Sequence, residues 1–337
     1  MEILINHLRL GVKLSIYIPL FLSIVNGYSQ IQNNGNLRIH SGASIGFHTD
    51  FTNDGGILTV DENSTLTSLS DIENKNSATL DINGTLKITG DLINTATFDQ
   101  DTGLVEFNGT TLQLISGNHT FFEVVIKSSD SIHVNSGLQQ IRKTLFLDNG
   151  VLQTNDSLLL ISDINRTARI AEITGGDITG DIIMQRYIDA GPNGFHMLGS
   201  ACTGQTLNDL NDDFITSGFT GSDYPGFPFT SIWWYDETLL GSKSVGWTAP
   251  NITDSLLPGQ GAHVYLGPVP LTLDVKGPAA KGDIDMGVTF SSSGDLLEDG
   301  WNFLANPYPS TIDWDAITWV KTNIDNAVYT WDADNQV

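Results

Sequence analysis

The sequence is poor in cysteine and in basic residues, and each shortage argues against a class of protein. Its 337 residues include one cysteine, Cys202, so no intrachain disulfide can form. Cys202 follows an apolar segment, and we expect it to be a buried, inert thiol. Lysine and arginine together number 15 against 39 acidic residues, for a formal net charge of −24. Such a chain repels nucleic acid and anionic lipid, so we expect no nucleic-acid partner.

Long apolar stretches are also scarce, and the one at the N-terminus is short. Leu14 to Val25 is 12 residues long, whereas a helix that spans a bilayer needs about 20. Arg9 and Lys13 precede this stretch, and the small residues of Gly27-Tyr28-Ser29 follow it. This order predicts a signal peptide over residues 1–29 that is cleaved on secretion. The mature protein would then be secreted or held at the cell surface without a transmembrane segment; a signal anchor is the alternative.

A repeated phrase organises the first half of the chain. It reads D-F-T-N from Asp50, D-I-E-N from Asp71 and D-L-I-N from Asp91, so that the aspartates are 21 and 20 residues apart. Each phrase is followed by alternating apolar residues, which is typical of stacked strands. We therefore predict an all-β protein with a β-solenoid-like domain over residues 30–181. The asparagines of the phrase, at 53, 74 and 94, are expected at turns, where their side chains can bond coil to coil; ligand binding by them is the alternative.

The pattern changes after residue 181. All seven tryptophans lie in this half, and short apolar segments alternate with turns rich in Gly, Pro and Asn. This texture predicts a β-sandwich-like or jelly-roll-like domain over residues 182–337. The chain stops at D-A-D-N-Q-V directly after an expected strand, so we expect this domain to be truncated at its C-terminus.

Three segments resemble a known class of proteins. They are G-L-V-E-F-N-G-T-T-L-Q-L-I-S-G from Gly103, G-D-I-I-M-Q-R-Y-I from Gly180, and G-W-N-F-L-A-N-P-Y-P-S-T-I-D-W from Gly300. Together they resemble the exported surface proteins of the Bacteroidetes that use the type IX secretion system. The resemblance implies export to the cell surface but no particular activity. Members usually end in a C-terminal sorting domain, and this chain shows no such tail.

One oxygen-rich segment is a candidate metal site. Asp209, Asp212 and Asp213 lie in N-D-L-N-D-D, a composition that calcium favours, but no EF-hand pattern is completed. Carboxylates that cap a loop are the favoured interpretation, and a structural calcium ion is the alternative. The histidines show no zinc-binding spacing, so no other cofactor is expected.

Consecutive aromatic residues offer a candidate binding surface. In Trp233-Trp234-Tyr235, strand alternation must turn Trp234 away from the face that Trp233 and Tyr235 share. One face would pack into the core, and the other could stack on a glycan. Burial of these rings is the more common outcome. Three serines, Ser131, Ser157 and Ser255, follow an aspartate and precede an aliphatic residue, which resembles the O-glycosylation acceptor of exported proteins in the same bacterial group.

These patterns favour a non-enzymatic surface protein. We expect a solenoid stalk followed by a sandwich, which acts as an adhesin-like structural protein and presents loops to a glycan or to another cell-surface component. The alternative is a secreted carbohydrate-binding or carbohydrate-active protein of the lyase or hydrolase type. An enzyme of that kind would need two close carboxylates, and no acidic pair in the sequence is favoured over another. Oligomeric state and ligand are not indicated.

Overall fold

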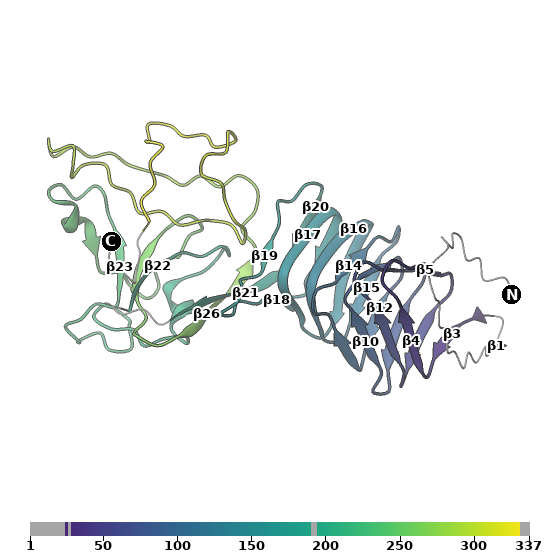
Figure 1. Ribbon diagram of the computed structural model, residues 1–337. Coiled ribbons are helices and arrows are strands. Elements are labelled where there is room, and N and C mark those ends of the chain that lie inside the picture. The colour runs from purple at the N-terminus through teal and green to yellow at the C-terminus, as the bar shows by residue number, and fades with distance from the viewer. Residues whose placement is uncertain (1–23, 26–27, 190–193, 331–337) are drawn as a thin grey trace. The chain divides into compact units, whose positions relative to one another are not determined.

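The computed structural model describes residues 24–25, 28–189 and 194–330 (Figure 1). The predicted signal peptide lies mostly outside the described residues, apart from β1 (Ile24–Val25) and β2 (Tyr28–Ser29), which pair antiparallel. The chain separates into two compact units. One comprises residues 1–161 and 168–180, and the other comprises residues 162–167 and 181–337.

The first unit is a β-solenoid of about eight turns, which confirms the all-β prediction and the solenoid. Three columns of parallel strands run along it, because each coil contributes one strand to each column. Column A contains β3 (Ile31–Asn33), β6 (Phe51–Asp54), β9 (Ile72–Lys75), β12 (Leu92–Asn94) and β15 (Gln113–Ser116). Column B contains β4 (Asn36–Ile39), β7 (Ile57–Val60), β10 (Thr79–Ile82) and β13 (Thr97–Asp99). Column C contains β5 (Ser44–Phe47), β8 (Thr65–Ser68), β11 (Thr85–Ile88) and β14 (Leu104–Phe107).

The later coils run through longer strands. β16 (His119–Ser136) and β17 (Gln139–Gln153) pair in parallel over most of their length and turn the corners of the solenoid without a break in strand structure. β18 (Leu158–Leu160), β19 (Arg169–Ile170) and β20 (Gly176–Thr179) each pair with a different part of β17 and complete the stack. The coils therefore continue after the repeated phrase has disappeared from the sequence.

Alternation along each strand builds the solenoid core. In β8, β11 and β14 the second residue points inward, and the parallel register continues into β16 and β17. The residues aligned in this way are Leu66, Leu86, Val105, Val124 and Leu145. All five are buried. Burying one such side chain contributes about 1.5–3 kcal/mol, and no coil could bury its apolar residues without its neighbours. The stack is thus the unit of stability.

The second unit contains two groups of antiparallel strands. β21 (Asp181–Ile188) pairs with β26 (Leu271–Pro278) over their full lengths. The other group is a four-stranded sheet in the order β22 (Phe195–Leu198), β25 (Ala262–Tyr265), β23 (Ile232–Tyr235) and β24 (Trp247–Thr248). Two short 3₁₀ helices complete the regular structure, η1 (Leu207–Leu210) and η2 (Lys243–Gly246).

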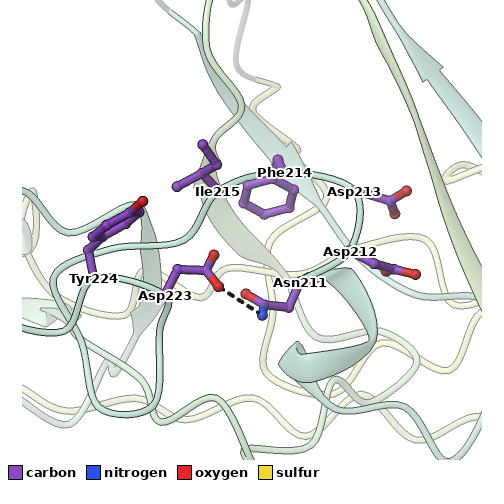
Figure 2. Close-up of a pocket in the computed structure, with 7 residues that line it drawn as sticks. All are labelled: Asn211, Asp212, Asp213, Phe214, Ile215, Asp223 and Tyr224. Carbon is purple, nitrogen blue, oxygen red and sulfur yellow. Dashed lines mark hydrogen bonds between the residues drawn. The ribbon is translucent and has the colours of Figure 1, made fainter.

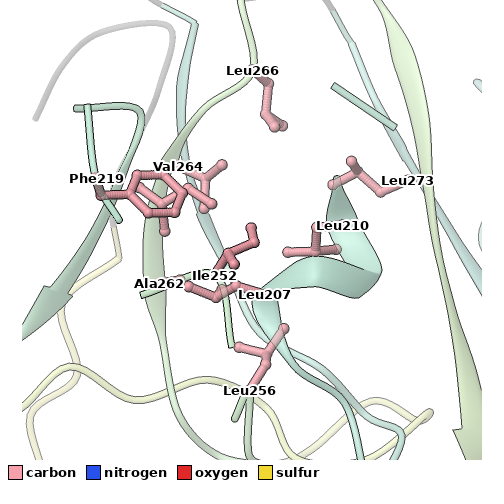
Figure 3. Packing of buried hydrophobic residues seen from close by; sticks show 10 residues of the cluster. Leu207, Leu210, Phe219, Ile252, Leu256, Ala262, Val264, Leu266 and Leu273 are labelled. Carbon is pink, nitrogen blue, oxygen red and sulfur yellow. The ribbon is translucent and has the colours of Figure 1, made fainter. Parts of the chain in front are cut away.

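A separate hydrophobic core holds this unit together (Figure 3). It joins Leu207 and Leu210 of η1 to Val264 of β25 and Leu273 of β26, with Phe219 from a loop. The described residues 279–330 contain no strand, although Leu304 forms an isolated bridge with Gln260. The sandwich therefore stays a prediction.

Candidate functional site

A chain of side-chain amides runs through the interior of the solenoid. Asn33 Nδ2 donates to Asn53 Oδ1 (2.8 Å), Asn53 Nδ2 donates to Asn74 Oδ1 (2.9 Å), and Asn74 Nδ2 donates to Asn94 Oδ1 (2.8 Å). The second Nδ2 hydrogen of Asn74 bonds to the Thr97 carbonyl oxygen (2.7 Å). Asn53, Asn74 and Asn94 are buried, so their amides bind neighbouring coils and are closed to ligands from solvent. The prediction that they bond coil to coil agrees with this geometry. The prediction that they lie at turns is wrong, because Asn53 and Asn74 lie within β6 and β9 and Asn94 is the last residue of β12.

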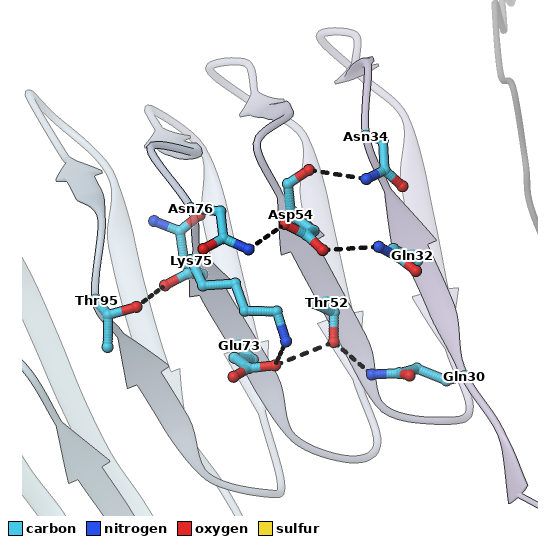
Figure 4. Close-up of polar contacts among 10 residues, drawn as sticks. Gln30, Gln32, Asn34, Thr52, Asp54, Glu73, Lys75, Asn76 and Thr95 are labelled. Atoms are coloured by element: carbon cyan, nitrogen blue, oxygen red, sulfur yellow. Dashed lines mark hydrogen bonds and ion pairs between the residues drawn. The ribbon is translucent and has the colours of Figure 1, made fainter. Parts of the chain in front are cut away.

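Polar groups on the outer side of column A also pair across coils (Figure 4). Gln32 Nε2 donates to Asp54 Oδ2 (2.8 Å), and Asn76 Nδ2 donates to Asp54 Oδ1 (2.7 Å). Within β9 itself, Lys75 Nζ lies 2.6 Å from Glu73 Oε2. Ion pairs as exposed as this contribute little to stability. These contacts nevertheless pair the polar side chains on the outer side of column A with one another.

The second unit contains an open hollow of about 610 Å³ beside η1 (Figure 2). Its lining is a run of consecutive residues and one facing loop: Asn211, Asp212, Asp213, Phe214, Ile215, Asp223 and Tyr224. Figure 2 shows the ring of Tyr224 at one end and the carboxylates of Asp212 and Asp213 at the other, with Asn211 and Asp223 between them.

Hydrogen bonds fix the middle of the hollow. Asn211 Nδ2 donates to Asp223 Oδ1 (3.2 Å), and Thr216 Oγ1 donates to Asn211 Oδ1 (2.6 Å). Asp223 Oδ2 accepts from the Thr216 backbone N–H (2.9 Å), which holds the pKa of Asp223 below its ordinary value. Bonds within the protein therefore hold the Asn211 and Asp223 side chains in place.

The carboxylates of Asp212 and Asp213, at the other end of the hollow, differ from Asp223 in their hydrogen bonds and in the pKa of Asp213. Burial, reinforced by the charges of Asp274 and Asp212, raises the pKa of Asp213 to about 6, although Asp213 Oδ2 accepts the Asp274 backbone N–H (2.8 Å). Asp212 is exposed, and its carboxylate accepts no hydrogen bond from the described residues. The hollow is therefore acidic, with unused acceptor capacity at Asp212.

The three aspartates considered for calcium serve different partners. Asp209 caps η1, because its Oδ2 accepts both the backbone N–H (2.7 Å) and the Oγ1 hydroxyl (2.9 Å) of Thr206. Asp213 bonds to the backbone of Asp274, and Asp212 faces solvent. Among the described residues, no group of three His, Cys, Asp or Glu side chains is arranged to hold a metal ion. The position of Asp209 agrees with the interpretation that it caps a loop.

The aromatic run on β23 is half-buried. Trp234 packs against the core of the second unit and points Nε1 at Asp254 Oδ2 (3.4 Å). The Tyr235 ring meets the Trp247 ring edge-on, with centroids 5.0 Å apart. Trp233 pairs with His263 on β25. Protein contacts thus occupy Trp234 and Tyr235, and glycan stacking by this run stays a prediction.

The serines and the cysteine differ in accessibility. Ser255 is exposed, whereas Ser131 and Ser157 are half-buried; their hydroxyls lie 3.3 Å from Asp130 Oδ1 and 3.1 Å from the Asn155 carbonyl oxygen. Their modification stays a prediction. Cys202 is buried, and burial raises the pKa of its thiol to about 12, so it carries no thiolate at neutral pH.

No sequence motif singles out Tyr224, the more exposed of the two aromatic residues that line the hollow. It lies in F-T-G-S-D-Y-P-G-F-P-F, from Phe219 to Phe229, where glycine and proline separate the aromatic residues. That composition is a signal for a turn-rich loop in which rings cannot all reach a core. The facing residues Asn211 to Asp213 belong to N-D-L-N-D-D, the segment whose composition indicates calcium.

Comparisons with known proteins add no relative. No family model, curated protein or solved structure matches the chain. Within the described residues, no helix has both the length and the apolar character needed to cross a membrane.

Proposed function

We propose that this chain is an exported, non-enzymatic surface protein, in which the solenoid is a stiff body and the second unit presents loops for contact with a glycan or another surface. The observation that carries the proposal is the solenoid interior, where apolar columns and the asparagine ladder bind each coil to the next. Stacked repeats of this kind form elongated bodies that need no disulfides, which agrees with the single cysteine.

The proposed route of export is the type IX system. It is supported by the resemblance of the segments from Gly103, Gly180 and Gly300 to exported proteins of that class. Retention of the protein inside cells whose type IX system has been inactivated would support this route, whereas unchanged export from those cells would contradict it.

Mass spectrometry and surface proteolysis test the location. We expect the mature protein to begin at Gln30, and we expect a protease added to intact producing cells to digest it while a periplasmic control protein survives. A chain that retains residues 1–29, or that is as protected as the control, contradicts the proposal.

Carbohydrate binding is the second candidate function. It is favoured by the hollow, where Tyr224 is 60% exposed at one end and the Asp212 carboxylate is exposed at the other. An exposed ring beside polar acceptors is the usual composition of a sugar-binding surface. Intrinsic fluorescence cannot test this candidate directly, because no tryptophan lines the hollow; binding has to be measured by calorimetry.

A further inference from the structure

Two groups of the hollow are left for a ligand. The Tyr224 ring is 60% exposed, although burying an aromatic ring of this size is worth several kcal/mol at most sites. The Asp212 carboxylate accepts no hydrogen bond from the described residues. Asn211 and Asp223 are bonded to each other and to Thr216. The ring and the free carboxylate therefore face the hollow from opposite ends with a fixed floor between them (Figure 2).

The loop that carries Tyr224 is held on both sides of the ring. The Tyr224 backbone N–H donates to the Thr216 carbonyl oxygen (3.2 Å), and the Tyr224 carbonyl oxygen accepts the Gly218 N–H (3.0 Å). Ser217 and Tyr224 form a β-bridge at the same place. Because the backbone is already ordered, binding at the ring costs little conformational entropy. The ordered backbone of this loop therefore holds the Tyr224 ring in its exposed position.

Charge restricts the ligand. Asp212, Asp213 and Asp223 line the hollow, and no lysine or arginine does. The whole chain carries a formal net charge of −24. A uronic-acid or sialic-acid glycan would be repelled by this field, whereas a protonated amine would be attracted.

We propose that this hollow binds a glycan that carries amino groups, with the Tyr224 ring stacked on the flat C–H face of a sugar and with Asp212 and Asp213 accepting hydrogen bonds from its ammonium and hydroxyl groups. The tyrosine ring also attracts a cation placed over its face. This inference rests on the proposed presentation of loops by the second unit, and it names the ligand class and the residues.

The shape of the site favours a sugar over a basic peptide. Cages that hold a lysine side chain surround it with several rings. Here only Tyr224 stands free, since Phe214 packs against the core of the unit. A single exposed ring beside an open floor matches the broad face of a pyranose better than a narrow side chain.

Calorimetry with the mature protein tests the inference. The probe is a fully deacetylated chito-oligosaccharide, and the comparison ligand is the fully N-acetylated oligosaccharide of the same length. We expect the amino form to bind more tightly and to lose affinity as salt is added, because screening weakens charge attraction. Tyr224→Ala should weaken binding roughly 5-fold, the size of an aromatic contact at an exposed site. Asp212→Asn should remove most of the preference for the amino form.

Matched controls come from the same unit. Phe227→Ala removes a ring from the same loop that is 57% exposed but does not line the hollow. Asp285→Asn removes an exposed carboxylate elsewhere in the second unit. Both should bind the amino form like the wild type.

Three results would overturn the inference: no binding of the amino form, equal loss in the Phe227→Ala control, or preferential binding of a lysine-rich peptide that Tyr224→Ala abolishes. If the protein is digested on intact cells yet binds no amino glycan, this inference fails while the proposed surface function stands. If the protein binds the amino glycan but is not exported, this inference stands while the proposed surface function fails.

Discussion

At the scale of single residues, Asn74 is the best test of the amide ladder. Its side chain accepts from Asn53 and donates to Asn94 and to the Thr97 carbonyl oxygen, and it is fully buried. Asn74→Ala leaves polar groups of both neighbouring coils without their partner. Each unsatisfied buried group costs about 1–3 kcal/mol, so we expect the unfolding free energy of the solenoid to fall by about 3 kcal/mol.

Urea denaturation followed by circular dichroism measures this loss. Asn34→Ala is the control, because Asn34 is exposed and makes one surface bond to the Asp54 carbonyl oxygen (3.1 Å). It should cost less than about 0.5 kcal/mol. Equal losses in the two variants would show that the ladder contributes nothing beyond surface hydrogen bonds.

His119 makes the solenoid sensitive to acid. Its ring is 1% exposed, lies stacked on Phe121 with centroids 5.1 Å apart, and places Nδ1 2.8 Å from Gln139 Oε1. Burial lowers the pKa of His119 to about 4 from an ordinary value of 6.5. Below pH 6.5 the unfolded chain takes up a proton that the folded chain refuses, so stability is full above pH 6.5 and falls as the pH drops toward 4. The loss over that window is about 3 kcal/mol.

The substitution His119→Gln keeps an amide partner for Gln139 but cannot titrate in this range. Urea midpoints at pH 7 and pH 4.5 should therefore differ less in His119→Gln than in the wild type. An identical pH dependence in both proteins would assign the acid sensitivity to other groups, for which the acidic surface is the first candidate.

At the scale of elements, the corners of the coils depend on close approach of one coil to the next. Gly117 has φ +93°, and a Cβ at this position would overlap the Asn94 carbonyl oxygen of the coil before it. Gly42 also has positive φ (+81°), but no atom lies within 4 Å of its Cβ position. Comparison of alanine substitutions at Gly42 and Gly117 therefore distinguishes the cost of backbone strain from the cost of steric overlap.

We expect Gly42→Ala to cost about 1 kcal/mol, the price of the left-handed conformation alone. Gly117→Ala should cost at least about 2 kcal/mol more, because adjacent strands β12 and β15 must move apart. Thermal unfolding of both variants measures the difference. Similar melting temperatures would mean that the coils adjust at this corner without loss of packing.

The sequence predicts those elements well whose structure depends on a regular pattern of nearby residues. The spacing of Asn53, Asn74 and Asn94 sufficed to predict bonds between coils, because equal spacing in a stack places equal residues in register. No repeated phrase predicts the bounds of β16 and β17, because backbone pairing continues through both strands without any repeated letters. Parallel pairing needs only main-chain groups, and its register is set by coils already formed.

The candidate site depended on contacts between distant residues, which no local rule supplies. Alternation places Trp234 and Tyr235 on opposite faces of β23, but their partners Asp254 and Trp247 follow from the path of the chain. The exposure of Tyr224 likewise results from hydrogen bonds of its loop to Thr216 and Gly218. The residue types of the hollow were visible in the sequence, whereas their convergence was not.

At the scale of the whole molecule, each unit has its own core. The solenoid core consists of columns such as Leu66, Leu86 and Val105, and the second core is built around Leu256 and Val264. All tryptophans of the chain belong to residues 181–337, so indole fluorescence reports unfolding of the second unit only. Substitutions at distant sites without shared partners act independently.

This division predicts a reciprocal result. Asn74→Ala should accelerate amide hydrogen exchange in column A while leaving the fluorescence midpoint in urea unchanged. Leu256→Ala, which opens a cavity in the second core at a cost of about 2–5 kcal/mol, should lower the fluorescence midpoint and leave exchange in column A as it is. If either substitution moves both signals together, the two units unfold as one cooperative body, and a solenoid that only carries the second unit would be the wrong description of how this protein is built.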